Sequence, residues 1–202
     1  MKNTTCVTLL VLSMTLTLSW TTKDTSITHL PDTVDTTYIA HDDFIPRLIG
    51  NQQNVTTFIF VRHGEKEDNS ADPTLNARGI ARADELMRVL KKVTIDAVYS
   101  SPFKRTRNTV MPTAIHHGKP VTDYSVHTSY QELVQTIRAD HDQKIVLIAG
   151  HSNTIPGLIK VLTDDKIDLK ITENQYDNLL IVFVPTSGDI LVKQLKYGNS
   201  TP

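Results

Sequence analysis

Residues 55–65 read VTTFIFVRHGE, a run of apolar and β-branched residues that leads into Arg62 and His63. A second run of this kind, residues 144–152, reads KIVLIAGHS and leads into His151. Apolar runs of this length that end in turn residues indicate buried strands. In an open parallel sheet the strand ends lie along one edge, where ligands bind. The sequence therefore predicts that two histidines and an arginine meet in one crevice, an arrangement that suits an oxyanion such as phosphate.

Strands and helices are expected to alternate along the rest of the chain. Besides the strands at 55–61 and 145–149, the apolar pattern predicts strands at 95–99 and 121–124, and helices at about 75–92, 103–116, 128–140 and 154–162. We expect Thr74 or Asn76 to cap the first helix, and Pro112 to kink or break the second. Residues 179–184 and 190–195 flank a turn that contains proline and glycine, and they predict a C-terminal hairpin. The alternation predicts an α/β fold: a single three-layer domain with a mostly parallel sheet, helices on both faces and a C-terminal hairpin.

The first residues have the composition of a secretory signal peptide. Lys2 is followed by an apolar stretch over residues 7–20, and a basic start with a short apolar core is typical of such peptides. The stretch is shorter than the roughly 20 apolar residues of a membrane span. We expect residues 1–20 to direct secretion or export to the periplasm, with an uncleaved N-terminal anchor as the alternative. Residues 21–54 are expected to form a linker and lead-in segment with a short element at 44–49, and residues 55–198 to form the domain.

The composition excludes several classes of partner and site. Lys and Arg number 21 against 22 Asp and Glu, so no global field favours nucleic acid or an anionic membrane, and neither is expected as a partner beyond the signal segment. The only cysteine, Cys6, lies in that segment. The rest of the chain therefore has no thiolate for zinc and no disulfide, which excludes zinc deaminase and cysteine phosphatase chemistry. We expect no metal site.

Three short motifs carry the candidate chemistry. Arg62 and His63 leave the first strand at a glycine turn, where imidazole can act as a nucleophile and guanidinium can hold phosphate oxygens. Residues 101–109 read SPFKRTRNT, which places Arg105 in the first turn of a helix, aimed at an anion; the alternative is a solvated basic stretch. His151 precedes a helix N-terminus that favours an anion, although a lone histidine there can also be a capping or packing residue.

In this order, the motifs resemble the histidine phosphatase superfamily, in the branch that includes cofactor-dependent phosphoglycerate mutases and small bacterial phosphohistidine phosphatases. The resemblance spans about residues 55–195 and looks closest to small secreted members. It implies a phosphoglycerate mutase-like domain that acts as a metal-independent phosphatase without a cofactor. It also implies that His63 becomes phosphorylated while Arg62, Arg105 and His151 hold the phosphoryl oxygens. The expected substrate is a small phosphorylated compound or a phosphohistidine protein, cleaved at a phosphate ester or a phosphoramidate.

The sequence departs from this branch at the proton donor. Many members carry an acidic residue after the third strand in a recognisable motif, and no convincing match is present. Glu65, Asp123 and Glu132 are the weak candidates. The polar loop 64–74 is expected to rim the site, with residues 164–177 on the opposite side. A mutase is an alternative function that a secreted location argues against, and a non-catalytic phosphate- or phosphoprotein-binding domain is another. The presence of both histidines favours an enzyme, since arginines alone could bind phosphate.

Overall fold

The computed structural model describes residues 38–50 and 53–202. The expected signal segment, residues 1–20, lies outside the described residues. In chain order the elements are α1 (Phe44–Ile49), β1 (Val55–Arg62), α2 (Ala77–Leu90), β2 (Ala97–Ser100), α3 (Lys104–His116), β3 (Val121–Asp123), α4 (Tyr130–Asp140), β4 (Ile145–Gly150), α5 (Thr154–Leu162), β5 (Asn178–Pro185) and β6 (Leu191–Lys196). The predicted strands and helices are all present, with ends that differ by a few residues at most.

The six strands form one sheet in the order β3-β2-β4-β1-β5-β6. Strands β3, β2, β4 and β1 are parallel to one another, while β5 runs antiparallel to β1 and β6 antiparallel to β5. The register pairs Arg62 with Gly150, so the ends of β1 and β4 lie level. The expected mostly parallel sheet with a C-terminal hairpin is confirmed.

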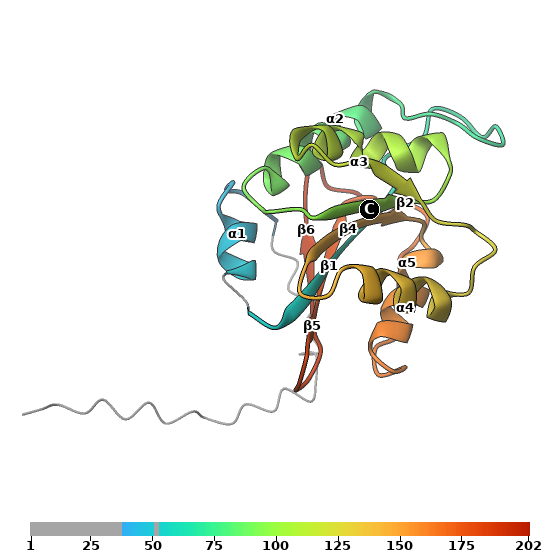
Figure 1. Cartoon of the computed structure of the whole chain (residues 1–202). Helices are drawn as coiled ribbons and strands as arrows, with labels where there is room; N and C mark the ends of the chain where they lie inside the picture. Colours follow the sequence, from blue (N-terminus) through green and yellow to red (C-terminus); the bar gives the residue numbers. More distant parts are fainter. Residues whose placement is uncertain (1–37, 51–52) are drawn as a thin grey trace, which may run out of the picture.

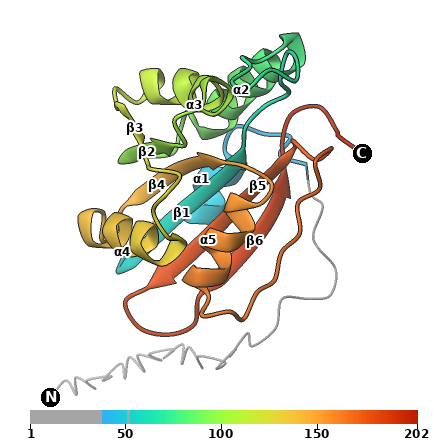
Figure 2. The same cartoon turned by 90° about the vertical axis from the view of Figure 1, so that its right-hand side faces the viewer.

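Helices cover both faces of the sheet (Figures 1 and 2). Successive residues of a strand point to opposite faces, and β1 divides its apolar side chains in this way. Ile59 and Val61 pack in a core with residues of α1, α2 and α3, and Phe58 and Phe60 pack in a second core with residues of α4 and α5. The result is a three-layer α/β domain, as expected.

Two local expectations about helices have different outcomes. Asn76 caps α2, because its side-chain oxygen accepts hydrogen bonds from the backbone N–H groups of Arg78 and Gly79. The break expected at Pro112 is absent, because Pro112 lies inside α3, which continues on both sides of it. Val110 and Ala114 on either side of the proline are buried in the core, and this packing offsets the loss of one backbone hydrogen bond.

Part of the expected lead-in segment packs onto the domain. Ile39, Ile45 and Ile49 are buried in the same core as α2 and α3, and the N–H of Ile39 donates to the carbonyl of Lys196 in β6. The packed structure therefore begins before residue 55.

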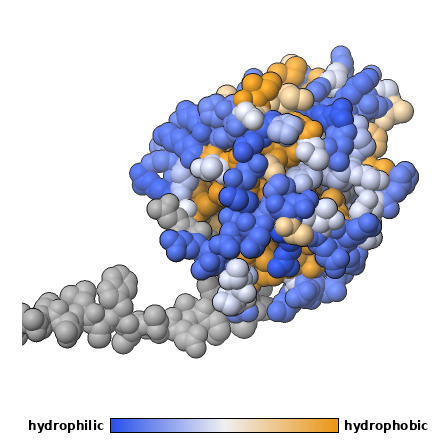
Figure 3. Space-filling model, in the orientation of Figure 1, coloured by the Kyte–Doolittle hydropathy of each residue, from blue (hydrophilic) through white to orange (hydrophobic). Residues whose placement is uncertain are grey.

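The surface drawn in Figure 3 is largely hydrophilic, with apolar atoms at the top, over α2 and α3. Exposed apolar side chains of these two helices are Ile80, Met111 and Ile115. Among the helices of residues 38–50 and 53–202, none has the length and apolar character needed to cross a membrane.

Candidate active site

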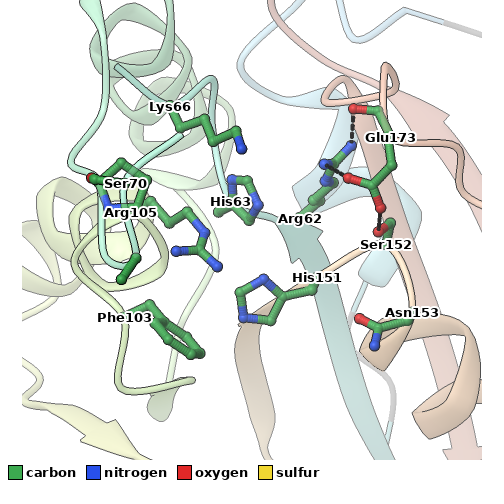
Figure 4. A pocket seen from close by; sticks show the side chains of 12 residues that line it. Arg62, His63, Lys66, Ser70, Phe103, Arg105, His151, Ser152, Asn153 and Glu173 are labelled. Atoms are coloured by element: carbon green, nitrogen blue, oxygen red, sulfur yellow. Dashed lines mark hydrogen bonds and ion pairs between the residues drawn. The ribbon is translucent and has the colours of Figure 1, made fainter. Parts of the chain in front are cut away.

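The carboxyl ends of β1, β2 and β4 lie along one edge of the sheet and open into a polar pocket with a volume of about 360 Å³ (Figure 4). All four predicted site residues line it, namely Arg62, His63, Arg105 and His151. They come from three different strand–turn–helix connections, so the parallel sheet brings together motifs that are far apart in the sequence, as expected at such an edge.

His63 follows the last residue of β1 and is buried, with 4% of its surface exposed. Its Nδ1 lies 2.7 Å from the carbonyl oxygen of Gly64, so this nitrogen carries the proton and donates it. The other ring nitrogen, Nε2, then keeps a free lone pair in the neutral imidazole. The turn itself is held by the N–H of Gly64, which donates to the hydroxyl of Thr109 at 2.8 Å. A Cβ on Gly64 would meet the backbone of Gly79 at 3.0 Å, so the close packing of this turn on α2 favours glycine.

Burial keeps both histidines neutral at ordinary pH. It lowers the pKa of His63 to about 3, and the nearby charges of Arg62 and Arg105 act in the same direction against the hydrogen bond to Gly64. Burial, followed by the charges of Arg105 and Arg62, lowers the pKa of His151 to about 4. A neutral His63 with a free Nε2 is the form that can attack phosphorus.

His151 follows β4 and faces His63 across the pocket, with 5.3 Å between the two ring centres. Its Nε2 lies 2.9 Å from the hydroxyl of Ser101, which in turn lies 2.9 Å from the hydroxyl of Thr106. The ring of Phe103 contacts it edge-on at 5.3 Å between centres. These contacts fix the imidazole, and a phosphoryl dianion beside it would raise its pKa and make it a better donor.

Arg105 lies in the first turn of α3 and lines the pocket on the side opposite Arg62 (Figure 4). Its guanidinium carbon lies 4.6 Å from the ring centre of Phe103, a cation–π contact that holds the group over the pocket. Arg107, two residues later, forms an ion pair with Asp123 and does not line the pocket. The basic stretch is therefore divided between one arginine in the pocket and one outside it.

Arg62 is buried at the end of β1, and the loop before β5 holds it. Its Nη1 donates to the carbonyl oxygens of Thr172, Glu173 and Gln175 at 3.0, 2.7 and 3.2 Å, and Nη2 donates to the Glu173 carboxylate at 2.8 Å. Its guanidinium carbon lies 4.2 Å from the ring centre of Tyr176. Among the side chains the structure describes, Arg62 Nε is one of the few buried polar atoms without a partner. Nε is thus the guanidinium nitrogen that the loop before β5 does not engage.

None of the three acidic residues considered from the sequence lines the pocket. Glu65 is buried in an ion pair with Arg82, Asp123 pairs with Arg107, and Glu132 is exposed on α4. The carboxylate at the pocket is that of Glu173, which sequence reasoning missed. The sequence placed its loop at the rim but offered no periodicity to say which of the loop's acids turns inward. Within residues 38–50 and 53–202, no group of three His, Cys, Asp or Glu residues is arranged to hold a metal ion.

Comparisons with known proteins agree with this description. Residues 58–125 match the family model of the histidine phosphatase superfamily (branch 1), and no match is found among curated proteins. Similar solved structures include a mycobacterial glucosyl-3-phosphoglycerate phosphatase (13% identity, TM-score 0.56, covering 70% of this chain and 99% of that one) and YhfR of Bacillus stearothermophilus (20%, 0.56, 68% and 95%). A mutant phosphoserine phosphatase from Entamoeba histolytica in complex with phosphoserine is also similar, with 18% identity and a TM-score of 0.51, over 66% of this chain and 96% of that one. The expected resemblance to the histidine phosphatase superfamily is confirmed by the family match over residues 58–125, and the expected fold is confirmed by the solved structures.

Proposed function

We propose that this chain, which carries a histidine phosphatase match over residues 58–125 and the fold of solved phosphatases, is itself a phosphatase. It would hydrolyse phosphate esters or phosphoramidates without a metal, through a phosphohistidine at His63. The observation that carries this proposal is the hydrogen bond from His63 Nδ1 to Gly64, because it leaves Nε2 free inside a pocket lined by two arginines and a second histidine.

In the first step, His63 Nε2 forms a bond to phosphorus while the bond from phosphorus to the leaving oxygen or nitrogen breaks. The leaving group takes up a proton. Arg62, Arg105 and His151 surround the equatorial oxygens and stabilise the charge that builds up on them. In the second step, water attacks the same phosphorus, the bond to Nε2 breaks, and inorganic phosphate leaves with His63 neutral again.

The pocket supports a small substrate. Its volume of about 360 Å³ and its polar lining suit a compact phosphorylated compound or the exposed side chain of a phosphohistidine protein. Two of the similar structures are a glucosyl-3-phosphoglycerate phosphatase and a phosphoserine phosphatase. Both names support a phosphorylated small molecule as the class of substrate. Residues 1–20 would place this activity outside the cytoplasm.

A substrate panel tests the proposal. The full chain is incubated with p-nitrophenyl phosphate, phosphoserine, phosphoramidate and a phosphohistidine peptide, each with and without EDTA, and released inorganic phosphate is measured. Turnover of at least one compound at equal rates in both conditions is expected. Loss of turnover in EDTA that one divalent metal restores would contradict the metal-independent reaction. Saturable binding of the phosphorylated compounds without phosphate release would favour the non-catalytic binding domain, and transfer of phosphate to a second position would favour a mutase.

A further inference from the structure

Glu173 is the only carboxylate that lines the pocket among the residues that the structure describes. Its carboxylate contacts Arg62 Nη2 at 2.8 Å and accepts a hydrogen bond from the hydroxyl of Ser152. Figure 4 shows it beside Arg62 and Ser152, on the side of the pocket across from Arg105. The next acid near the pocket, Asp72, accepts a hydrogen bond from the backbone of Lys104 and does not line the pocket.

The position of this carboxylate is determined by the fold although 80% of the side chain is exposed. The backbone around it is tied to the buried Arg62 by three carbonyl acceptors, one of which is its own. The loop is closed on itself as well, because the N–H of Gln175 donates to the carbonyl of Thr172 and the Gln175 side chain accepts from the N–H of Thr172. A surface side chain on such an anchored loop loses less entropy when it acts at a fixed point.

The groups that face Glu173 favour its ionised form. The hydrogen bond from Ser152 lowers the pKa of Glu173, and the charges of Arg62 and Lys66 act in the same direction. Glu173 in turn acts to raise the pKa of His151. An ionised carboxylate is a proton acceptor, and a phosphoryl dianion bound beside it would raise its pKa and favour the protonated form.

The positions of His63 and Glu173 at different depths of the pocket fit an in-line displacement. His63, the nucleophile in the proposed function, lies at the buried floor, with 4% of its surface exposed, whereas Glu173 lies at the exposed mouth. The attacking and leaving groups in phosphoryl transfer lie on opposite sides of phosphorus. The leaving group of the first step and the water of the second step must therefore both approach from the mouth.

From this arrangement we infer that Glu173 is the general base that activates water against the phosphohistidine. This inference rests on the proposed function and adds its missing proton-transfer group. In the second step, water oxygen forms a bond to phosphorus, the bond to His63 Nε2 breaks, and the Glu173 carboxylate takes the water proton. In the first step, Glu173 is protonated beside the bound phosphoryl group and donates its proton to the leaving group, which leaves the carboxylate that the second step needs. One residue thus serves both steps, and the net reaction consumes only water.

Burst kinetics of Glu173→Gln in the full chain test this role with p-nitrophenyl phosphate, whose leaving group needs no proton. The first step should stay fast while the second slows by about 10²-fold or more. Stopped-flow should then show a burst of one nitrophenolate per enzyme followed by slow turnover, and acid-free quenching should show the phosphoenzyme accumulating. With an alkyl phosphate the burst should disappear, because the first step then also needs the acid. Glu132→Gln, an exposed change on α4 away from the pocket, is the matched control and should behave as wild type.

Two results would overturn the inference while leaving the phosphatase intact. One is wild-type turnover of Glu173→Gln. The other is slow turnover without a burst and with a raised KM, which would mean that Glu173 only positions Arg62. A wild-type protein that shows neither turnover nor phosphoenzyme would overturn the proposed function, and this inference with it.

Discussion

Glu65→Ala should destabilise the protein strongly, although Glu65 adjoins the proposed nucleophile. Glu65 and Arg82 are 7% and 3% exposed, and Arg82 donates to both carboxylate oxygens at 3.0 and 2.8 Å. Arg82 also donates to the carbonyls of Tyr197 and Asn199 at 2.9 and 2.8 Å, so it cannot leave the interior without breaking these bonds. Removing one partner of a buried ion pair costs about 3–5 kcal/mol. For a domain of this size, that corresponds to a fall in Tm of about 6–20 °C.

Thermal unfolding followed by circular dichroism measures the loss, and turnover is compared well below the lower Tm. Because the carboxylate is engaged by Arg82 and does not line the pocket, we expect the pH profile of turnover to keep its shape. The double variant Glu65→Ala with Arg82→Met removes the uncompensated charge, so it should be less destabilised than the two single changes added together. An unchanged Tm accompanied by lost turnover would refute this reasoning and return Glu65 to the chemistry as a proton donor.

Three further predictions concern phosphate binding, acid stability and export. Arg105→Ala should lower kcat/KM by on the order of 10²-fold or more, since it removes charge stabilisation in the pocket, while Arg107→Ala should change it only a few-fold; the reverse ranking in steady-state assays would contradict the placement of α3. The pKa values of His63 and His151 lie at about 3 and 4 in the folded protein, below the ordinary value of about 6.5. Between these pKa values and pH 6.5, the two histidines bind more protons in the unfolded chain than in the folded one. Stability should therefore fall as the pH drops below about 6, by up to about 1.4 kcal/mol per pH unit for each histidine. Urea unfolding at several pH values should show a shallower loss in His63→Gln, and an equal slope would count against a buried neutral His63. Finally, residues 1–20 fused to a reporter should deliver it outside the cytoplasm, and a reporter retained in the cytoplasm would refute the proposed location.

The sheet edge and the residues gathered there could be predicted because the signals are local. Strand β1 is a run of apolar and β-branched residues that ends in Arg62, and β4 is a continuous apolar run. Each strand is followed directly by a histidine, and parallel strands end at one edge. The place of Arg105 at the pocket could be predicted because it falls in the first turn of α3. The capping role of Asn76 could be predicted because an asparagine precedes a helical pattern. Such inferences need only the sequence near each residue and one rule about how parallel sheets are assembled.

The remaining features depend on contacts between distant parts of the chain. Glu173 lies 111 residues from Arg62 in a loop without periodicity, so no local pattern ties its carboxylate to the pocket. Pro112 lacks a hydrogen-bond donor, which predicts a break, but buried neighbours on both sides keep α3 in one piece. Glu65 was a candidate acid because it adjoins His63, and its pairing with Arg82 of α2 became visible only in the folded chain.

Trapping the phosphoenzyme tests the central claim most directly. Rapid quenching of the full chain with substrate labelled on the phosphoryl group should give a protein-bound label that is stable in base and labile in acid, as a phosphohistidine is. The label should map to His63, and His63→Ala should lose both label and turnover. His151→Ala should slow both labelling and hydrolysis. If His63→Ala instead turns substrate over at the wild-type rate, His63 is not the nucleophile and the proposed two-step mechanism is wrong.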